Sequence, residues 1–170
     1  MEYSASLWLD LPGQFVLGAS TALFGLAGIA ASACIYLVPA RPAWNVSYTV
    51  FDFYLTGALL GPLFAGSHVQ AAMAAAVMQL LVQGARFLWL SRSEEFELKA
   101  SARLLANDLS KLFLLRFALL VIGGLVLPAL GYVAAGFALA LAGEFLGRYL
   151  FFISVVPKNI AASFFAGRAA

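Results

Sequence analysis

The sequence predicts an all-α integral membrane protein, a bundle of about five transmembrane helices with one interfacial amphipathic segment. Of the 170 residues, 64% are hydrophobic and 11% are charged. A water-exposed domain of this size carries roughly a quarter of its residues as charges. The apolar residues form five stretches, each long enough for a helix that crosses a bilayer core. All ten Lys and Arg residues fall on one side of these stretches.

The five predicted spans form a single membrane domain over residues 1–170. The first span carries no charged residue, and Pro39, Pro42 and Trp44 follow it. Two prolines stop a helix, and an aromatic side chain suits the membrane–water interface. Gly131 leaves so short a connection that the last two spans are expected to form an antiparallel hairpin. The spans cover residues of about 14–38, 47–65, 69–90, 112–130 and 132–156.

A polar segment, residues 91–111, separates the third span from the fourth and holds much of the charge. Its apolar positions are Phe96, Leu104, Leu105 and Leu109, with charged residues between them. This pattern is typical of a helix that lies along the membrane interface or against a partner. We therefore predict an interfacial helix in a cytoplasmic loop.

The distribution of positive charge predicts the orientation. With five spans, the first loop, the 91–111 loop and the C-terminus share one face of the membrane. Every Lys and Arg lies nearer to that face than to the other. Positively charged loops stay on the cytoplasmic side. We therefore predict an external N-terminus and a cytoplasmic C-terminus.

Polar groups inside a membrane span are costly, so each is a candidate for function. Glu144 and Arg148 lie one helical turn apart on one face of the last span. They are either an intrahelical ion pair that holds the bundle together or a proton-handling, quinone-adjacent pair. His68, the single histidine, lies between the second and third spans. It is either exposed polar surface or a group that exchanges protons with a quinol headgroup.

Three further ionisable residues inside the spans are assigned structural roles. Asp52 lies one turn into the second span and is expected to pair with Arg41, Arg86 or Arg148, or to be solvated. Arg86 and Arg116 lie near the cytoplasmic ends of their spans. Long basic side chains at such positions usually extend to the interface.

The composition also excludes several kinds of site within this chain. Axial bis-histidine haem ligation needs two histidines, and there is one. A single cysteine, Cys34, excludes a disulfide framework and a cysteine-ligated iron–sulfur cluster. No metal site and no catalytic triad is predicted, and a net charge of +2 does not suggest nucleic-acid binding. In any redox role, electrons would have to enter from a partner subunit.

Four segments together resemble a known family. They are residues 28–44 (GIAASACIY and RPAW), 51–57 (FDFYLTG), 97–105 (ELKASARLL) and 143–159 (GEFLGRYLFF and VPKN). The stretch from Leu23 to Phe165 is similar to the dimethyl sulfoxide reductase membrane-anchor family (DmsC-type), which is related to the polysulfide reductase and NrfD-like anchors. The resemblance is to the C-terminal five-helix portion of a longer anchor.

The resemblance implies a membrane-anchor subunit of a molybdopterin/iron–sulfur oxidoreductase complex. Such an anchor is not itself catalytic and works without haem. It holds an iron–sulfur electron-transfer subunit and a molybdopterin catalytic subunit at a bacterial cytoplasmic membrane, where the complex exchanges electrons with menaquinone or ubiquinone. The residues alone leave two alternatives open. One is a small multi-pass transporter or channel whose polar path includes Asp52 and Glu144, and the other is a ligand-free membrane scaffold.

Overall fold

The computed structural model describes residues 14–158, and every regular element in that range is a helix. The predicted all-α class is therefore confirmed. The predicted positions before residue 14 and after residue 158 lie outside the described residues. The elements are α2 (Gln14–Cys34), α3 (Ser47–Ala65), α4 (Val69–Arg92), α5 (Phe96–Ala106), α6 (Ser110–Val121), the π-helical turn η1 (Ile122–Val126), α7 (Leu127–Ala129) and α8 (Val133–Ile153).

Four helical stretches within the described range are long and apolar enough to cross a membrane, where the sequence predicted about five. They are Phe15–Cys34, Val69–Arg92, Ser110–Ala129 and Val133–Ile153. The remaining predicted span corresponds to α3, which is a helix of 19 residues. Its first half contains Tyr48, Thr49, Asp52 and Thr56, and these polar side chains lower its mean hydropathy.

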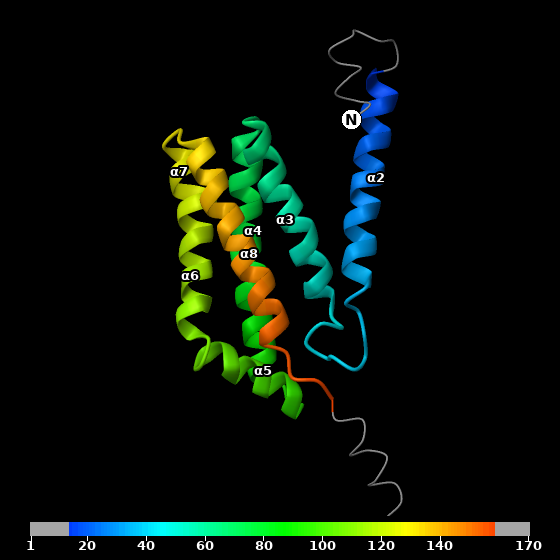
Figure 1. Cartoon of the computed structure of the whole chain (residues 1–170), viewed down its shortest axis with the longest axis vertical. Coiled ribbons are helices and arrows are strands. Elements are labelled where there is room, and N and C mark those ends of the chain that lie inside the picture. The colour runs from blue at the N-terminus through cyan, green and yellow to red at the C-terminus, as the bar shows by residue number, and fades with distance from the viewer. Residues whose placement is uncertain (1–13, 159–170) are drawn as a thin grey trace, which may run out of the picture.

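Helices α3, α4, α8 and the α6–α7 stretch pack side by side, and α5 lies across one end of this bundle (Figure 1). The end that α5 covers is called the α5 end below, and the opposite end, with the turn from α3 to α4, is called the His68 end. Helix α5 turns Leu98, Ser101, Ala102 and Leu105 into the bundle. Of its predicted apolar positions, Leu105 is buried, whereas Phe96 is 74% exposed.

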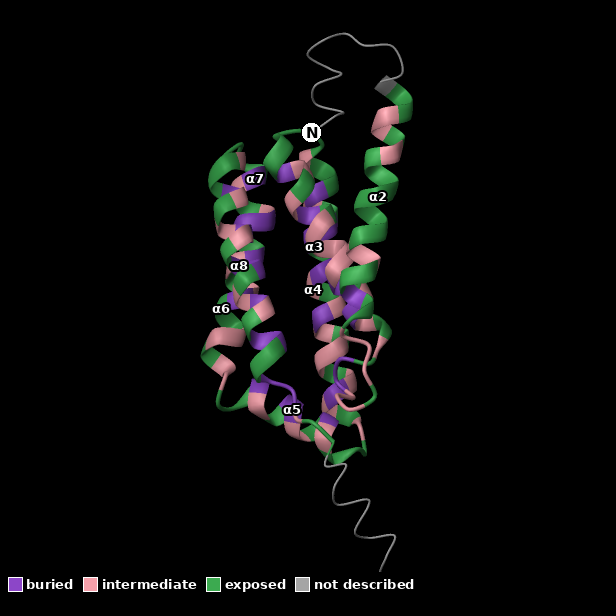
Figure 2. Cartoon of the chain, turned by 45° about the vertical axis from the view of Figure 1, so that its right-hand side comes forward, coloured by how far each residue is buried: buried purple, intermediate pink, exposed green. Residues whose placement is uncertain are grey.

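Helix α2 stands beside the bundle and packs mainly on α3 (Figure 1). Most of its surface is exposed (Figure 2), including the large apolar side chains of Phe15, Leu23 and Phe24. A contiguous apolar surface of this kind is unfavourable in water and marks a face that contacts lipid or another protein. The Tyr54 hydroxyl of α3 donates a hydrogen bond to the Leu26 carbonyl at 3.2 Å, which ties the two helices together.

The connection from α2 to α3 folds back into the α5 end through Trp44. The Trp44 Nε1 donates a hydrogen bond to the Phe151 carbonyl at 2.9 Å. The two rings are stacked with centroids 5.1 Å apart, and the Arg41 guanidinium lies over the indole. Because the Phe151 carbonyl is in the last turn of α8, this loop fixes the end of α8 that follows Arg148.

Glycines allow α6 and α8 to approach closely. A Cβ atom added at Gly123 would overlap backbone atoms of Gly136 and Ala140 on α8. Gly123 lies in η1, where the α-helical hydrogen-bond pattern widens to a π turn. The predicted hairpin turn is also present, because Gly131 adopts a φ of +85°, a conformation that favours glycine. The last two spans are therefore neighbours in contact.

Candidate functional site

Eight polar side chains from four helices gather between α3, α4, α6 and α8. Their positions along each helix follow a spacing of three or four residues, which places them on one inward face. We call them the polar cluster. Its members are Asp52 and Thr56 of α3, Gln79, Gln83 and Arg86 of α4, Arg116 of α6, and Glu144 and Arg148 of α8.

Glu144 lies near the middle of α8 and is 5% exposed. Its carboxyl group has a partner on each oxygen. Oε2 lies 2.6 Å from Thr56 Oγ1, and Oε1 accepts a hydrogen bond of 2.6 Å from Gln79 Nε2. A carboxyl group buried without such partners would be strongly unfavourable. The predicted candidate is therefore held by side chains of α3 and α4.

The Thr56 hydroxyl lies between three groups, although it has only one hydrogen to donate. Its Oγ1 is 2.8 Å from the Asp52 carbonyl, 2.6 Å from Glu144 Oε2 and 3.2 Å from Arg148 Nη2. With Glu144 ionised, the Thr56 hydroxyl donates its hydrogen bond to Glu144 and makes none to the Asp52 carbonyl. With Glu144 protonated, Glu144 donates to Thr56 and Thr56 donates to the Asp52 carbonyl. Both protonation states of Glu144 thus keep a hydrogen bond to Thr56.

Arg148 and Glu144 do not form the direct ion pair that was one of the two predictions. No Arg148 nitrogen lies within 4.0 Å of a Glu144 carboxylate oxygen among the ion pairs of residues 14–158. Arg148 instead donates a hydrogen bond to Thr56 at 3.2 Å, and its guanidinium lies 3.7 Å from the centre of the Phe53 ring. The interaction with Glu144 is therefore mediated by a neutral hydroxyl, and an aromatic face stabilises the cation.

Asp52 forms a buried ion pair with Arg116. Arg116 Nη2 lies 3.4 Å from Asp52 Oδ1, and the side chains are 8% and 7% exposed. The expected partners of Asp52, namely Arg41, Arg86 and Arg148, are therefore wrong. Arg116 was expected to extend to the interface, but it points into the bundle. The reason is a gap at Gly147, where a Cβ atom would overlap the Arg116 guanidinium.

Arg86 also points inward, contrary to the prediction that it extends to the interface. Its Nη2 donates a hydrogen bond to the Ala43 carbonyl at 3.0 Å, and its guanidinium lies 5.3 Å from the centre of the Phe151 ring. The folded-back loop before α3 supplies that carbonyl, so Arg86 finds an acceptor inside the protein. Arg86 therefore links α4 to this loop at the α5 end.

His68 does not join the polar cluster. It is exposed in the turn between α3 and α4, with a left-handed backbone conformation of φ 52°. Gln79, which contacts Glu144, lies 11 residues further along α4, or about 16 Å at the rise of an α-helix. The three functional candidates are thus split: Glu144 and Arg148 share one site, and His68 lies apart at the His68 end.

Sequence reasoning missed Thr56, Gln79 and Gln83, because it considered ionisable residues and overlooked neutral polar ones. A usable signal was present. Thr56 follows Asp52 by four residues, and Gln79, Gln83 and Arg86 follow one another at helical spacing inside an otherwise apolar segment. Such spacing places polar groups on one face, and in a membrane span that face turns inward.

Residues 14–158 contain no group of three or more His, Cys, Asp or Glu side chains that could hold a metal ion. Comparisons of the chain with protein-family models, with curated proteins and with solved structures found no match. The functional argument therefore rests on the geometry of the polar cluster. That geometry combines a buried carboxyl group that keeps its partners in either protonation state with cations held close by.

Proposed function

We propose that this chain is a membrane-anchor subunit of a molybdopterin/iron–sulfur oxidoreductase complex of the dimethyl sulfoxide reductase type, and that the complex exchanges electrons with the quinone pool. The observation that carries the proposal is the enclosed Glu144 carboxyl group, which Thr56 and Gln79 hold at the middle of an apolar bundle. Quinol oxidation releases protons, and a carboxyl group that accepts and releases one without losing its partners suits that step.

In this proposal α3 is a fifth transmembrane helix despite its lower hydropathy. It lies alongside α4 within the bundle (Figure 1), and its polar residues Asp52 and Thr56 turn inward to the polar cluster. The α5 end then faces the cytoplasm of a bacterial cell and the N-terminus faces outward, in accordance with the positive charges. Helix α5 lies along the cytoplasmic interface.

The cluster supports separate roles for its members. Glu144 holds the exchangeable proton, Thr56 reverses its own hydrogen bond so that Glu144 keeps a partner in either protonation state, and Arg148 donates a hydrogen bond to the Thr56 hydroxyl. His68 is separate from these residues, because it is exposed at the His68 end, next to the first residue of α4. The iron–sulfur and molybdopterin groups would reside in the partner subunits, and menaquinone or ubiquinone would be bound at the level of the complex.

The transporter alternative also draws on a specific observation. Gln79, Gln83 and Arg86 form a polar line along α4 from Glu144 to the α5 end, as a path for a solute would. Three guanidinium groups lie in or beside that line, and they would repel metal cations. The observation thus argues against a metal-cation channel.

The test is co-purification and quinol-linked activity with a neighbouring iron–sulfur subunit and its catalytic subunit. The tagged chain is expected to bring down both subunits and to support quinol-linked reduction in membranes. The Glu144→Gln variant keeps the shape of the side chain but holds no exchangeable carboxyl proton. It should lower the quinol-linked rate by about 100-fold or more, as expected for loss of a general acid–base group, with the co-purified amounts unchanged.

Glu95→Gln is the matched control, because Glu95 is a glutamate that is half-exposed outside the bundle. Its quinol-linked rate should equal that of the unaltered chain. The proposal is rejected if no iron–sulfur subunit is recovered with the chain. An unchanged rate with Glu144→Gln would reject the role of Glu144, and solute flux through the purified chain in liposomes would favour a transporter.

A further inference from the structure

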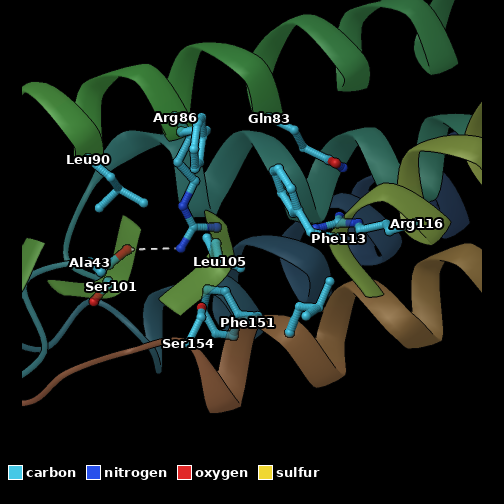
Figure 3. A pocket seen from close by; sticks show the side chains of 12 residues that line it. Ala43, Gln83, Arg86, Leu90, Ser101, Leu105, Phe113, Arg116, Phe151 and Ser154 are labelled. Carbon is cyan, nitrogen blue, oxygen red and sulfur yellow. Dashed lines mark hydrogen bonds between the residues drawn. The ribbon is translucent and has the colours of Figure 1, made fainter. Parts of the chain in front are cut away.

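A small cavity lies at the α5 end, between α4, α5, α6 and α8 (Figure 3). Its volume is about 40 Å³. Because one water molecule needs about 10–15 Å³ of such space, it has room for only a few water-sized groups. Its polar lining comes from Gln83, Arg86, Arg116, Ser101 and Ser154, and the other lining residues are apolar.

The polar lining is incompletely paired. Gln83 is 5% exposed, yet neither its amide oxygen nor its amide nitrogen has a hydrogen-bond partner among residues 14–158. The Nε atoms of Arg86 and Arg116 are likewise shut off from solvent without a protein partner in that range. Buried polar atoms in folded proteins are nearly always paired. The side chains of Gln83 and Arg86 both extend from α4 toward the cavity (Figure 3).

The charge around the cavity is positive. Arg116 is paired with Asp52, and Arg148 and Glu144 meet at Thr56. Arg86 has no carboxylate within 4.0 Å among the described residues. Its hydrogen bond goes to the neutral Ala43 carbonyl. The polar cluster therefore holds three guanidinium groups and two carboxyl groups, and the unmatched cation faces the cavity.

We infer that this cavity binds a small inorganic anion of the size of chloride. The anion would accept hydrogen bonds from Arg86 and from the Gln83 amide nitrogen, with the Arg116 guanidinium beside it. Water alone would pair the amide but would leave the Arg86 charge unbalanced in an apolar bundle. The volume excludes a phospholipid headgroup and larger carboxylates. A cation is excluded because the adjacent guanidiniums repel it.

Chloride is the probe, with the purified full-length chain in detergent. Two quantities are measured: the excess line width of ³⁵Cl in NMR, and the melting temperature as chloride replaces gluconate at constant ionic strength. Gluconate is too large for the cavity. The unaltered chain is expected to broaden the ³⁵Cl line saturably and to melt at a higher temperature in chloride, because a ligand that binds only the folded state stabilises it.

Gln83→Leu and Arg86→Gln should each raise the half-saturating chloride concentration at least about tenfold, since each removes a hydrogen bond to a charged partner. Arg92→Gln is the matched control, because Arg92 is an exposed arginine near the end of the same helix, and it should leave the titration unchanged. If Arg86→Gln does not fold, Gln83→Leu decides. The inference is overturned if the melting temperature stays the same as chloride replaces gluconate, or if ³⁵Cl broadening is equal in Gln83→Leu and the unaltered chain.

Discussion

Residues 14–158 contain two ion pairs that differ in burial. A comparison of the two tests how much the stability of the polar cluster depends on charge. In one, Arg116 Nη2 lies 3.4 Å from Asp52 Oδ1, with side chains 8% and 7% exposed. In the other, Lys158 Nζ lies 3.9 Å from Glu95 Oε2, with side chains 46% and 54% exposed. Coulomb attraction at 3.4 Å is about 5 kcal/mol at an effective dielectric constant of 20.

Asp52→Asn removes the negative charge and leaves the Arg116 guanidinium buried and uncompensated. We expect this variant to lower the free energy of unfolding by about 3–5 kcal/mol, the usual cost of removing one member of a buried pair. The double variant Asp52→Asn/Arg116→Gln removes both charges, so it should be less destabilised than the sum of the two single variants by about 1–3 kcal/mol. The reason is that most of the single-variant cost comes from the stranded charge.

Glu95→Gln breaks the exposed pair and serves as the control. Because water solvates and screens both of its members, we expect a loss below about 1 kcal/mol. All variants are unfolded with SDS in mixed micelles and followed by far-UV circular dichroism. Equal losses for Asp52→Asn and Glu95→Gln, or strict additivity in the double variant, would refute the view that the Asp52–Arg116 pair is a desolvated unit.

Two further predictions concern packing. Gly123→Ala should lower the free energy of unfolding by about 1–3 kcal/mol, as overpacking does, because its Cβ would overlap the α8 backbone. Gly28 has open space around it, so Gly28→Ala should instead raise the free energy of unfolding by about 0.5–1 kcal/mol. The same unfolding titration in mixed micelles compares the two variants. Trp44→Phe keeps the stacked ring but removes the hydrogen bond to the Phe151 carbonyl. It should lower the free energy of unfolding by about 0.5–1.5 kcal/mol and speed backbone amide exchange in the last turn of α8. Unchanged exchange in that turn would contradict the anchoring role of the loop.

The positions of the helices could be predicted from the sequence because the residues that determine where a helix begins and ends are local. Long apolar runs, prolines and a glycine turn predict where a helix begins and ends, and α3 covers the predicted residues 47–65. Its candidacy as a span depends on hydropathy, which Asp52 and its polar neighbours lower. A transmembrane helix with a polar inward face can have the same mean hydropathy as a helix that does not span the membrane. Composition alone therefore does not distinguish the two cases.

The partners within the polar cluster were not accessible, because they depend on which helices are neighbours and at what height. Asp52 had three arginines as plausible partners along the chain, and the true partner came from α6. Arg86 and Arg116 look like interface residues when each helix is considered by itself. Their inward orientation depends on acceptors that other segments supply, the Ala43 carbonyl for Arg86 and Asp52 for Arg116.

The glycine pattern shows the same limit. Gly57 and Gly61 of α3 are four residues apart, a spacing of small residues that is typical of close helix packing in membranes. A Cβ at Gly61 would contact nothing within 4 Å, and one at Gly57 would meet only the end of the Ile29 side chain. The close helix contact lies instead along α8, where the buried small residues are Gly136, Ala140, Gly143 and Gly147. This series faces the α6–α7 stretch, and α8 therefore carries both the close helix packing and two members of the polar cluster.

Gly147 is the position at which the helix packing and the polar cluster depend on each other. A Cβ atom there would overlap the Arg116 guanidinium, so Arg116 would have to shift from its position beside Asp52. Such a shift would disturb the ion pair of Asp52, which lies one turn before Thr56, the hydroxyl that holds Glu144. Gly147 has no side chain, and this leaves space for the Arg116 guanidinium and its ion pair with Asp52. The residue just before Arg148 therefore contributes to the site although it makes no polar contact through a side chain.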